Sequence, residues 1–117
     1  VRRRLLAYID AHLPDNDALS LGQLAQQAHL SEFHLSRMFR LSMGCSIHAW
    51  IVQQRIARAC HWLTHSNMSM TDIAWRCGFH SASHLHHTLH KHLHTTPLHI
   101  RQAGPCKNNS KKSELLT

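Results

Sequence analysis

A pattern that occurs twice in the chain constrains its fold more than any other feature of the sequence. In the first copy a serine is followed by apolar residues one, four, five and eight positions later: Ser20, Leu21, Leu24, Ala25 and Ala28. The second copy begins 49 positions after the first: Ser69, Met70, Ile73, Ala74 and Cys77. This spacing places the apolar residues on one face of a short helix. Each serine, with Gln23 or Asp72 three residues later, predicts a capping box at the start of that helix.

The second half of each copy predicts another short helix. A tight turn comes first: His29-Leu30 in one copy and Gly78-Phe79-His80 in the other. Ser31 and Ser81 then supply N-caps, and apolar residues follow four and eight positions later. These residues are Leu35 and Phe39 in the first copy and Leu85 and Leu89 in the second. Two short helices joined by a tight turn form a helix-turn-helix, whose second helix lies in the major groove of DNA.

The other periodic segments predict further helices, so we expect an all-α fold. Apolar residues at helical spacing occupy residues 2–13, and residues 46–65 form a long helix of roughly 30 Å, close to the ~34 Å between successive major-groove windows. We expect one DNA-binding domain over residues 1–102. It contains the first helix-turn-helix at about 20–41, the linker helix at about 46–65, the second helix-turn-helix at about 69–92 and a closing helix at about 96–102. Residues 103–117 are polar, basic and without periodicity, which predicts a disordered tail.

The charge balance points to a polyanionic partner. Thirteen Lys and Arg stand against six Asp and Glu, a net charge of +7 with neutral histidines, which favours nucleic acid first and an anionic membrane surface second. No apolar run approaches the roughly 20 residues that span a bilayer, and no signal peptide follows Arg2-Arg3-Arg4. We therefore expect a soluble cytoplasmic protein that does not act on membranes. Because the chain begins at Val1, we expect it to be cut from a longer one that carries an effector domain.

The sequence shows no pattern of an enzyme. The four cysteines contain no C-x-x-C pair, which excludes a zinc knuckle and fits a reducing compartment: Cys45, Cys60, Cys77 and Cys106. Cys60 and Cys77 fall at apolar helical positions, where core packing and a reactive thiol are the alternatives. There is no nucleophile with a base and an orienting acid, no phosphate-binding glycine loop and no paired-carboxylate site. We expect neither catalytic residues nor a cofactor.

Several motifs together carry a family resemblance over about residues 5–102. They are Leu30-Ser31, Leu35-Ser36-Arg37-Met38-Phe39-Arg40, Gly44, Gln54-Arg55-Ile56-Ala57-Arg58-Ala59, Asp72-Ile73-Ala74, Cys77-Gly78-Phe79, Thr96-Pro97 and Ile100-Arg101. With these motifs the chain resembles the AraC/XylS family of bacterial transcription regulators. The resemblance implies seven helices in two helix-turn-helix subdomains bridged by a long central helix. It also implies recognition helices in adjacent major-groove segments of promoter DNA.

The resemblance implies partners as well. They are RNA polymerase and an N-terminal effector or dimerisation domain in the full-length chain. The second recognition helix departs from the family pattern, because Leu85, His86 and His87 stand where members usually carry an aromatic residue, Ser and Arg. His94 also replaces a glycine that many members have after that helix. These departures predict a weaker or differently tuned second contact.

The helical period predicts which residues read DNA bases. With the apolar residues of 31–41 facing the core, the period turns Phe33, Ser36 and Arg37 outward. Arg37 is expected to bond guanine bidentately and Phe33 to meet a thymine methyl, while Ser36 is permissive. The alternative is that Arg37 is a solvated surface charge. In the second motif the residues expected to contact bases are Ala82, Ser83, His86 and His87.

A second set of cationic residues is expected to contact the DNA backbone. These residues lie near helix ends or on exposed faces, where phosphate contacts hold the register but carry no sequence information. They are Arg40, Arg55, Arg58, Arg76, His90, Lys91 and Arg101.

Histidine is unusually abundant. The chain has 14 histidines, eight of them between His80 and His99, and several are spaced four residues apart, as in His86 and His90. Such a pair can hold a transition metal on one helix face, but no cysteine or carboxylate is placed to complete a site. We therefore expect no metal centre. A histidine-rich metal-binding protein and a metal- or pH-modulated regulator remain the alternatives to simple DNA binding.

Overall fold

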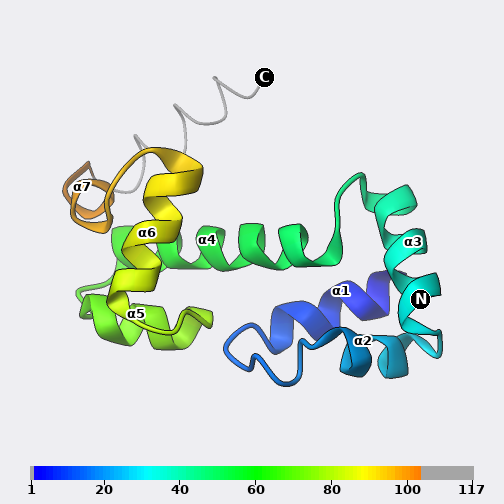
Figure 1. Ribbon diagram of the computed structural model, residues 1–117. Coiled ribbons are helices and arrows are strands. Elements are labelled where there is room, and N and C mark those ends of the chain that lie inside the picture. The colour runs from blue at the N-terminus through cyan, green and yellow to red at the C-terminus, as the bar shows by residue number, and fades with distance from the viewer. Residues whose placement is uncertain (1, 104–117) are drawn as a thin grey trace. The chain divides into compact units, whose positions relative to one another are not determined.

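The computed structural model describes residues 2–103, which form seven α-helices and no strand (Figure 1). The helices are α1 (Arg2–Ala11), α2 (Leu21–Ala28), α3 (Glu32–Met43), α4 (Ile47–His65), α5 (Met70–Cys77), α6 (Ala82–Leu93) and α7 (Pro97–Ala103). The predicted all-α fold with seven helices is therefore confirmed. The segment expected to be a disordered tail lies, from residue 104 onward, outside the described residues.

The described residues divide within α4 into two compact units, one up to Arg55 and the other from Ile56 onward. In the first unit α2 and α3 pack together, and α1 packs on α2. In the second unit α5 packs on α6, and α6 packs on α7. Each unit thus contains one of the two predicted helix-turn-helix motifs, and α4 supplies residues to both units.

Side-chain caps begin six of the helices. In each case a hydroxyl oxygen accepts a hydrogen bond of 3.1–3.3 Å from the backbone N–H three residues later. The capping residues are Ser20, Ser31 and Ser46 in the first unit and Ser69, Ser81 and Thr96 in the second. A hydroxyl cap of this kind contributes about 1 kcal/mol by satisfying an N–H that the helix itself leaves unpaired.

The apolar periodicity of the sequence becomes the core of each unit. The first core contains Leu5, Ile9, Leu13, Leu24, Leu35, Phe39, Ile47 and Ile51. In the second unit the buried residues include Ile56, Ala59, Leu63, Ile73, Cys77, Phe79, Leu85, Leu89 and Ile100. Of the two cysteines expected at apolar positions, Cys77 is fully buried, so it packs in the core, whereas Cys60 is only half-buried.

Four helices end in a residue with the left-handed backbone conformation. After α2 and α6 that residue is a histidine, His29 (φ 58°) or His94 (φ 56°). After α3 and α5 it is a glycine, Gly44 (φ 80°) or Gly78 (φ 91°). Each motif therefore contains one glycine and one histidine at such ends, in opposite order. The left-handed region costs an L-residue roughly 1–2 kcal/mol, and glycine avoids this cost.

Replacing these histidines by glycine should stabilise the protein. We expect His29→Gly and His94→Gly each to raise the free energy of unfolding by about 0.5–1 kcal/mol, since relief of backbone strain exceeds the greater flexibility of glycine in the unfolded chain. The matched control is His92→Gly inside α6, which should lower it by about 1 kcal/mol. Urea unfolding of the three variants measures the difference. Destabilisation by all three would show that the two histidine side chains contribute more than the strain costs.

Candidate nucleic-acid interface

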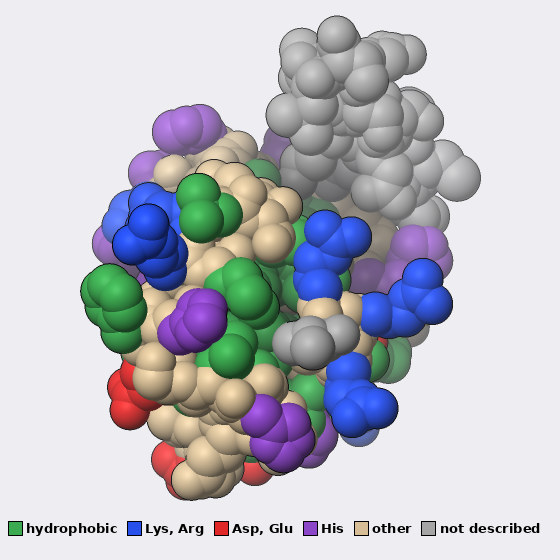
Figure 2. All heavy atoms as spheres, turned by 90° about the vertical axis from the view of Figure 1, so that its right-hand side faces the viewer, with side chains coloured by type: hydrophobic (Ala, Val, Ile, Leu, Met, Phe, Trp, Pro, Cys, Tyr) green, Lys and Arg blue, Asp and Glu red, His purple; other side chains and the backbone are tan. Residues whose placement is uncertain are grey.

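Helix α3 presents its predicted DNA-reading residues to solvent. Leu35 and Phe39 are buried, and this fixes the rotation of the helix about its axis. Phe33, Ser36 and Arg37 are exposed as a consequence, and Phe33 is 76% exposed, unusual for so large an apolar side chain. Figure 2 faces the side on which α3 lies in Figure 1, and Lys and Arg stand out there at two places with hydrophobic and histidine side chains between them. Arg40, on the next turn of α3, is exposed as well.

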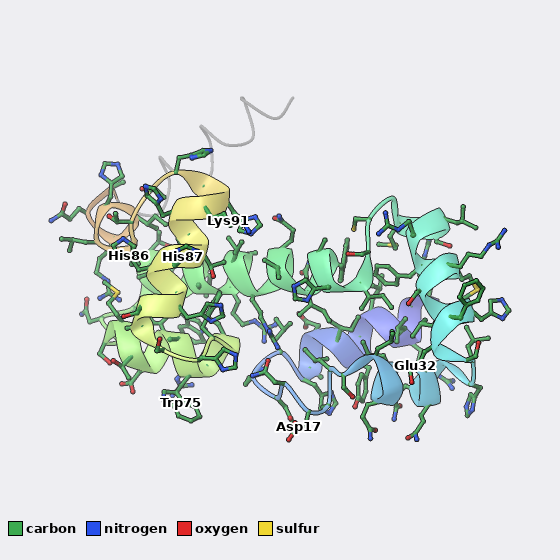
Figure 3. The ribbon with its side chains drawn as sticks, viewed as in Figure 1. Asp17, Glu32, Trp75, His86, His87 and Lys91 are labelled. Carbon is green, nitrogen blue, oxygen red and sulfur yellow. The ribbon has the colours of Figure 1, made fainter. Side chains whose placement is uncertain are left out.

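Helix α6 repeats this arrangement in the second unit. Leu85, Thr88 and Leu89 are buried. The exposed residues of the helix include Ser83, His86, His87, His90 and Lys91. Figure 3 shows His86, His87 and Lys91 extending from α6, whereas Trp75 projects from α5 away from it. Ala82, at the first position of α6, is half-buried and offers a DNA base less surface than the others.

The two recognition helices differ in charge at equivalent positions. Positions fifty residues apart have the same burial along both helices, except that Ala82 and Thr88 are more buried than Glu32 and Met38. His87 occupies the position of Arg37, and His90 that of Arg40. A guanidinium is always charged, while an imidazole is largely neutral above pH 7. The first motif therefore carries permanent charge where the second carries titratable groups.

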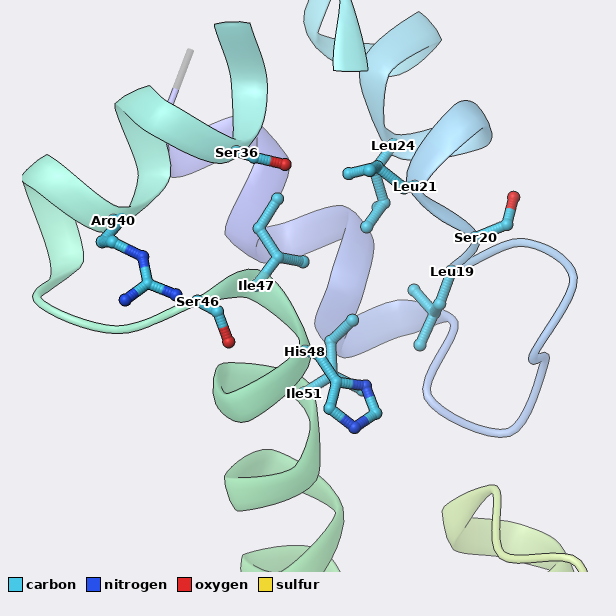
Figure 4. Close-up of a pocket in the computed structure, with 10 residues that line it drawn as sticks. All are labelled: Leu19, Ser20, Leu21, Leu24, Ser36, Arg40, Ser46, Ile47, His48 and Ile51. Atoms are coloured by element: carbon cyan, nitrogen blue, oxygen red, sulfur yellow. The ribbon is translucent and has the colours of Figure 1, made fainter. Parts of the chain in front are cut away.

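A groove lies beside each recognition helix. In the first unit a cavity of about 460 Å³ is bounded by α2, α3 and the start of α4 (Figure 4). Its lining is apolar at Leu21, Leu24, Ile47 and Ile51 and polar at Ser36, Arg40, Ser46 and His48. In the second unit a cavity of about 440 Å³ occupies the equivalent place, lined by Met70, Ala82, Ser83, His86, Thr96, Pro97 and Leu98. Neither groove was predicted from the sequence, although Ser46 and Thr96, which line one groove each, stand fifty positions apart like the other equivalent residues of the two motifs.

Two arginines expected at the DNA backbone are engaged within the protein. Arg55 Nε donates to the carbonyl of Leu13 at 3.2 Å, and its Nη2 donates to Asn16 Oδ1 at 2.8 Å. Arg101 Nε donates to the carbonyl of Leu63 at 3.2 Å, and its Nη2 donates to that of Met68 at 2.7 Å.

Both arginines are half-buried, and each ties a late helix of its unit to the segment before the helix-turn-helix. This points to a structural role for Arg55 and Arg101, and the interface proposed below does not include them.

The remaining predicted backbone contacts differ in exposure. Arg58 is half-buried, and Arg76 is exposed, with its Cζ 5.8 Å from the centre of the Trp62 ring. A cation over an aromatic face at this distance is held in place but keeps its N–H groups available. Arg76 therefore remains free to meet a phosphate at its outer edge.

The histidines do not converge on a metal site. Within residues 2–103, no group of three or more His, Cys, Asp or Glu side chains is placed to hold a metal ion. His80 and His84 stack with their ring centres 5.2 Å apart, and His84 Nδ1 accepts a hydrogen bond from the backbone N–H of His80 at 3.2 Å. One ligand atom of that pair is thus already used. Across the same residues, none of the helices is both long and apolar enough to cross a bilayer.

A family model described as a helix-turn-helix domain matches residues 24–103, and the solved structures that share this fold include AraC-type DNA-binding domains. The chain belongs to the AraC-type helix-turn-helix family. This family consists of transcription regulators. The expected resemblance is thereby confirmed.

Relatives within the AraC-type family cover most of this chain. The regulatory protein PocR of Salmonella typhimurium is 34% identical over 100 residues, which are 86% of this chain and 32% of PocR. The transcriptional activator RhaS of Shigella boydii is 34% identical over 98 residues, 84% of this chain and 34% of RhaS. The probable transcription factor PqrA of Proteus vulgaris is 29% identical over 86% of this chain and 82% of PqrA. The chain thus spans about a third of the length of PocR and RhaS.

Solved AraC-type structures share the fold. The DNA-binding domain of the global transcriptional factor AdpA, in complex with a target DNA, has a TM-score of 0.80 and 29% identity over 86% of this chain and 89% of that one. An AraC-type regulator from Chromobacterium violaceum has a TM-score of 0.78 and 25% identity, covering 86% of this chain and 88% of that one. The arrangement of seven helices is therefore that of known DNA-binding domains.

The hydrogen bonds of Arg101 predict an effect on stability. Arg101→Ala should lower the free energy of unfolding by about 1–3 kcal/mol, because two carbonyls lose a charged donor. Arg101→Lys should recover only part of this loss, since an ammonium cannot serve both carbonyls with the same fork. Arg37→Ala is the matched control and should stay within about 0.5 kcal/mol. Denaturant unfolding without DNA decides the matter: an unchanged stability for Arg101→Ala would return Arg101 to the candidates for phosphate contact.

Proposed function

We propose that this chain is the DNA-binding domain of a bacterial transcription regulator and that it binds specific double-stranded DNA through α3 and α6. The observation that carries the proposal is the repeated presentation of a second helix whose polar face is exposed in each motif. The similarity to the DNA-binding domain of AdpA, solved with a target DNA, supports it. Each recognition helix enters the major groove, and the two occupy adjacent segments of one site.

Helix α3 supplies the permanently charged half of the interface. Arg37 bonds O6 and N7 of a guanine, for which a guanidinium has the matching pair of donors. Phe33 meets a thymine methyl, a contact that accounts for a phenylalanine exposed to 76% in the absence of DNA. Ser36 and Arg40 line the same cavity of the protein. Arg40 bonds a DNA phosphate and so fixes the position of α3 along the DNA.

Helix α6 supplies the second half. Ser83, His86 and His87 face the bases, with Ala82 at the edge of this set because it is half-buried. His90 and Lys91, on the next turn of α6, contact the DNA backbone. Arg58 and Arg76 contact the flanking phosphates.

The longer relatives suggest the rest of the protein. Because the chain spans about a third of PocR and RhaS, we propose that an effector-binding or dimerisation domain accompanies it in the full-length chain. The promoter-bound regulator contacts RNA polymerase in the cytoplasm. No catalytic residue, cofactor or metal is part of this proposal. The histidine-rich metal-binding alternative has no support in the structure or the comparisons, so it is not carried further.

Substitution of Arg37 and Arg40 separates base reading from phosphate contact. Arg37→Ala should cost about 1–3 kcal/mol on the preferred site and relax the preference at one base pair, whereas Arg40→Ala should weaken all sequences alike. Competition binding with selected and random duplexes measures both losses. If Arg37→Ala lowers affinity for selected and random DNA equally, Arg37 is a surface charge and not a reader of bases.

The spacing of the site tests whether both motifs bind. The site consists of two half-elements, the DNA segments bound by α3 and by α6. Five base pairs inserted between them rotate one half-element by about half a helical turn relative to the other and should abolish binding by both motifs together. The matched control is a five-pair substitution at the same place, which keeps the spacing and should have little effect. Equal affinity for the inserted and uninserted duplexes would mean that a single motif engages DNA.

A further inference from the structure

The side chains that α6 offers to DNA are mostly histidines. Ser83, His86, His87 and His90 line one open cavity of about 350 Å³ on the exposed side of the helix. His86 also lines the groove between α6 and the start of α7. The three imidazoles thus form one continuous surface on the helix that the proposed function places in the major groove. At the equivalent positions of α3 stand Ser36, Arg37 and Arg40.

We propose that the surface of His86, His87 and His90 is a proton-linked binding site for the second half-element of the DNA, so that pH sets how much α6 contributes to recognition. This inference rests on the proposed function and deepens it. Helix α3 anchors the protein at every physiological pH through guanidinium groups. Helix α6 adds its share only as its imidazoles take up protons from solution.

The surroundings of these histidines leave DNA as their charge partner. The 350 Å³ cavity is lined by residues of α6 alone. To the other cavity the neighbouring elements contribute uncharged residues, namely Met70 from α5, Thr96 before α7, and Pro97 and Leu98 within it. The ionisable side chains of α5 and α7 line neither cavity: Asp72, Arg76, His99 and Arg101. Among the described residues of α5 and α7, therefore, no carboxylate lines these cavities beside the imidazoles, and a DNA phosphate can act as their anionic partner.

Other basic groups lie along α6 itself. Lys91 follows His90 directly and is four residues after His87. A phosphate that approaches this face neutralises Lys91 and favours the charged imidazoles at the same time. Protonation of these imidazoles is therefore more favourable in the DNA complex than in the free protein.

The sign of the pH dependence follows. A group that is charged more readily in the complex than in the free protein takes up a proton on binding, so affinity rises as pH falls. An imidazole titrates near pH 6.5 in water, so the effect falls between about pH 6 and pH 8. For each imidazole favoured by about one pKa unit, the affinity for the second half-element should rise roughly fivefold between pH 8.0 and pH 6.0. Two such imidazoles give roughly 25-fold.

The experiment compares permanently charged arginine, permanently neutral glutamine and titratable histidine on the same face of α6. Duplexes are selected from random DNA by the native chain at pH 6.0, and each half-element is then scrambled in turn. If scrambling one half-element removes the difference in affinity between the native chain and Arg37→Ala, that half-element is the one bound by α3. The other half-element is then the one bound by α6. The measured quantity is the ratio of affinities for the intact duplex and the duplex with the α6 half scrambled, at pH 6.0 and pH 8.0 and at constant salt.

For the native chain this ratio should be at least fivefold larger at pH 6.0 than at pH 8.0. His87→Arg/His90→Arg, on the duplex that it selects itself, should give a high ratio at both pH values. His86→Gln/His87→Gln/His90→Gln should give a low ratio at both. The control His92→Gln/His99→Gln removes two exposed histidines that line neither cavity and should behave as the native chain does.

The proton-linked site and the proposed function would be overturned by different outcomes. Specific binding with a native ratio that is independent of pH would reject the proton-linked site and leave the proposed function standing. The same rejection follows if His86→Gln/His87→Gln/His90→Gln keeps the native pH dependence, because the protons would then be taken up outside the proposed site. Failure to select any duplex at pH 6.0 would reject the proposed function itself.

Discussion

Burial of Leu35 in α3 and of Leu85 in α6 sets which side of each recognition helix faces solvent. Both leucines are fully buried, and the helical period then exposes the next two residues on each helix. A buried leucine contributes about 2–5 kcal/mol relative to alanine, whereas an exposed charged contact contributes at most about 1 kcal/mol. The core therefore dictates the orientation of the helix, and the residues that meet DNA have to be accommodated on the face that remains.

The hydroxyl caps and the left-handed helix ends form a polar frame around each core. Both units repeat this frame, although the residue types at equivalent places differ. Hydroxyl caps occupy equivalent places in both units, with Thr96 in the place of Ser46. At each of the two equivalent left-handed helix ends, one motif has glycine and the other has histidine. The fold therefore tolerates substitutions worth about 1 kcal/mol each in this frame, because none of them changes the packing of the buried leucines.

The two units use the same scaffold for different surface chemistry. Guanidinium groups at Arg37 and Arg40 correspond to imidazoles at His87 and His90. Since all four side chains are exposed, this exchange costs the fold little stability. It changes instead what each helix offers to a polyanion: permanent charge on α3 and titratable charge on α6, with Lys91 as a fixed charge on the second helix.

The sequence by itself determined the seven helices, the serine caps of α2, α3, α5 and α6, and the exposed faces of α3 and α6, because periodicity and capping depend on residues within a few positions of one another. Only the tertiary structure revealed the hydrogen bonds of Arg55 and Arg101 within the protein. Their partners, the carbonyls of Leu13 and Leu63, are 42 and 38 residues away, and no local pattern marks them. The grooves beside α3 and α6 depend in the same way on how distant helices approach one another. An arginine looks equally suited to a phosphate or to a carbonyl until the packing of the chain brings one of them within reach.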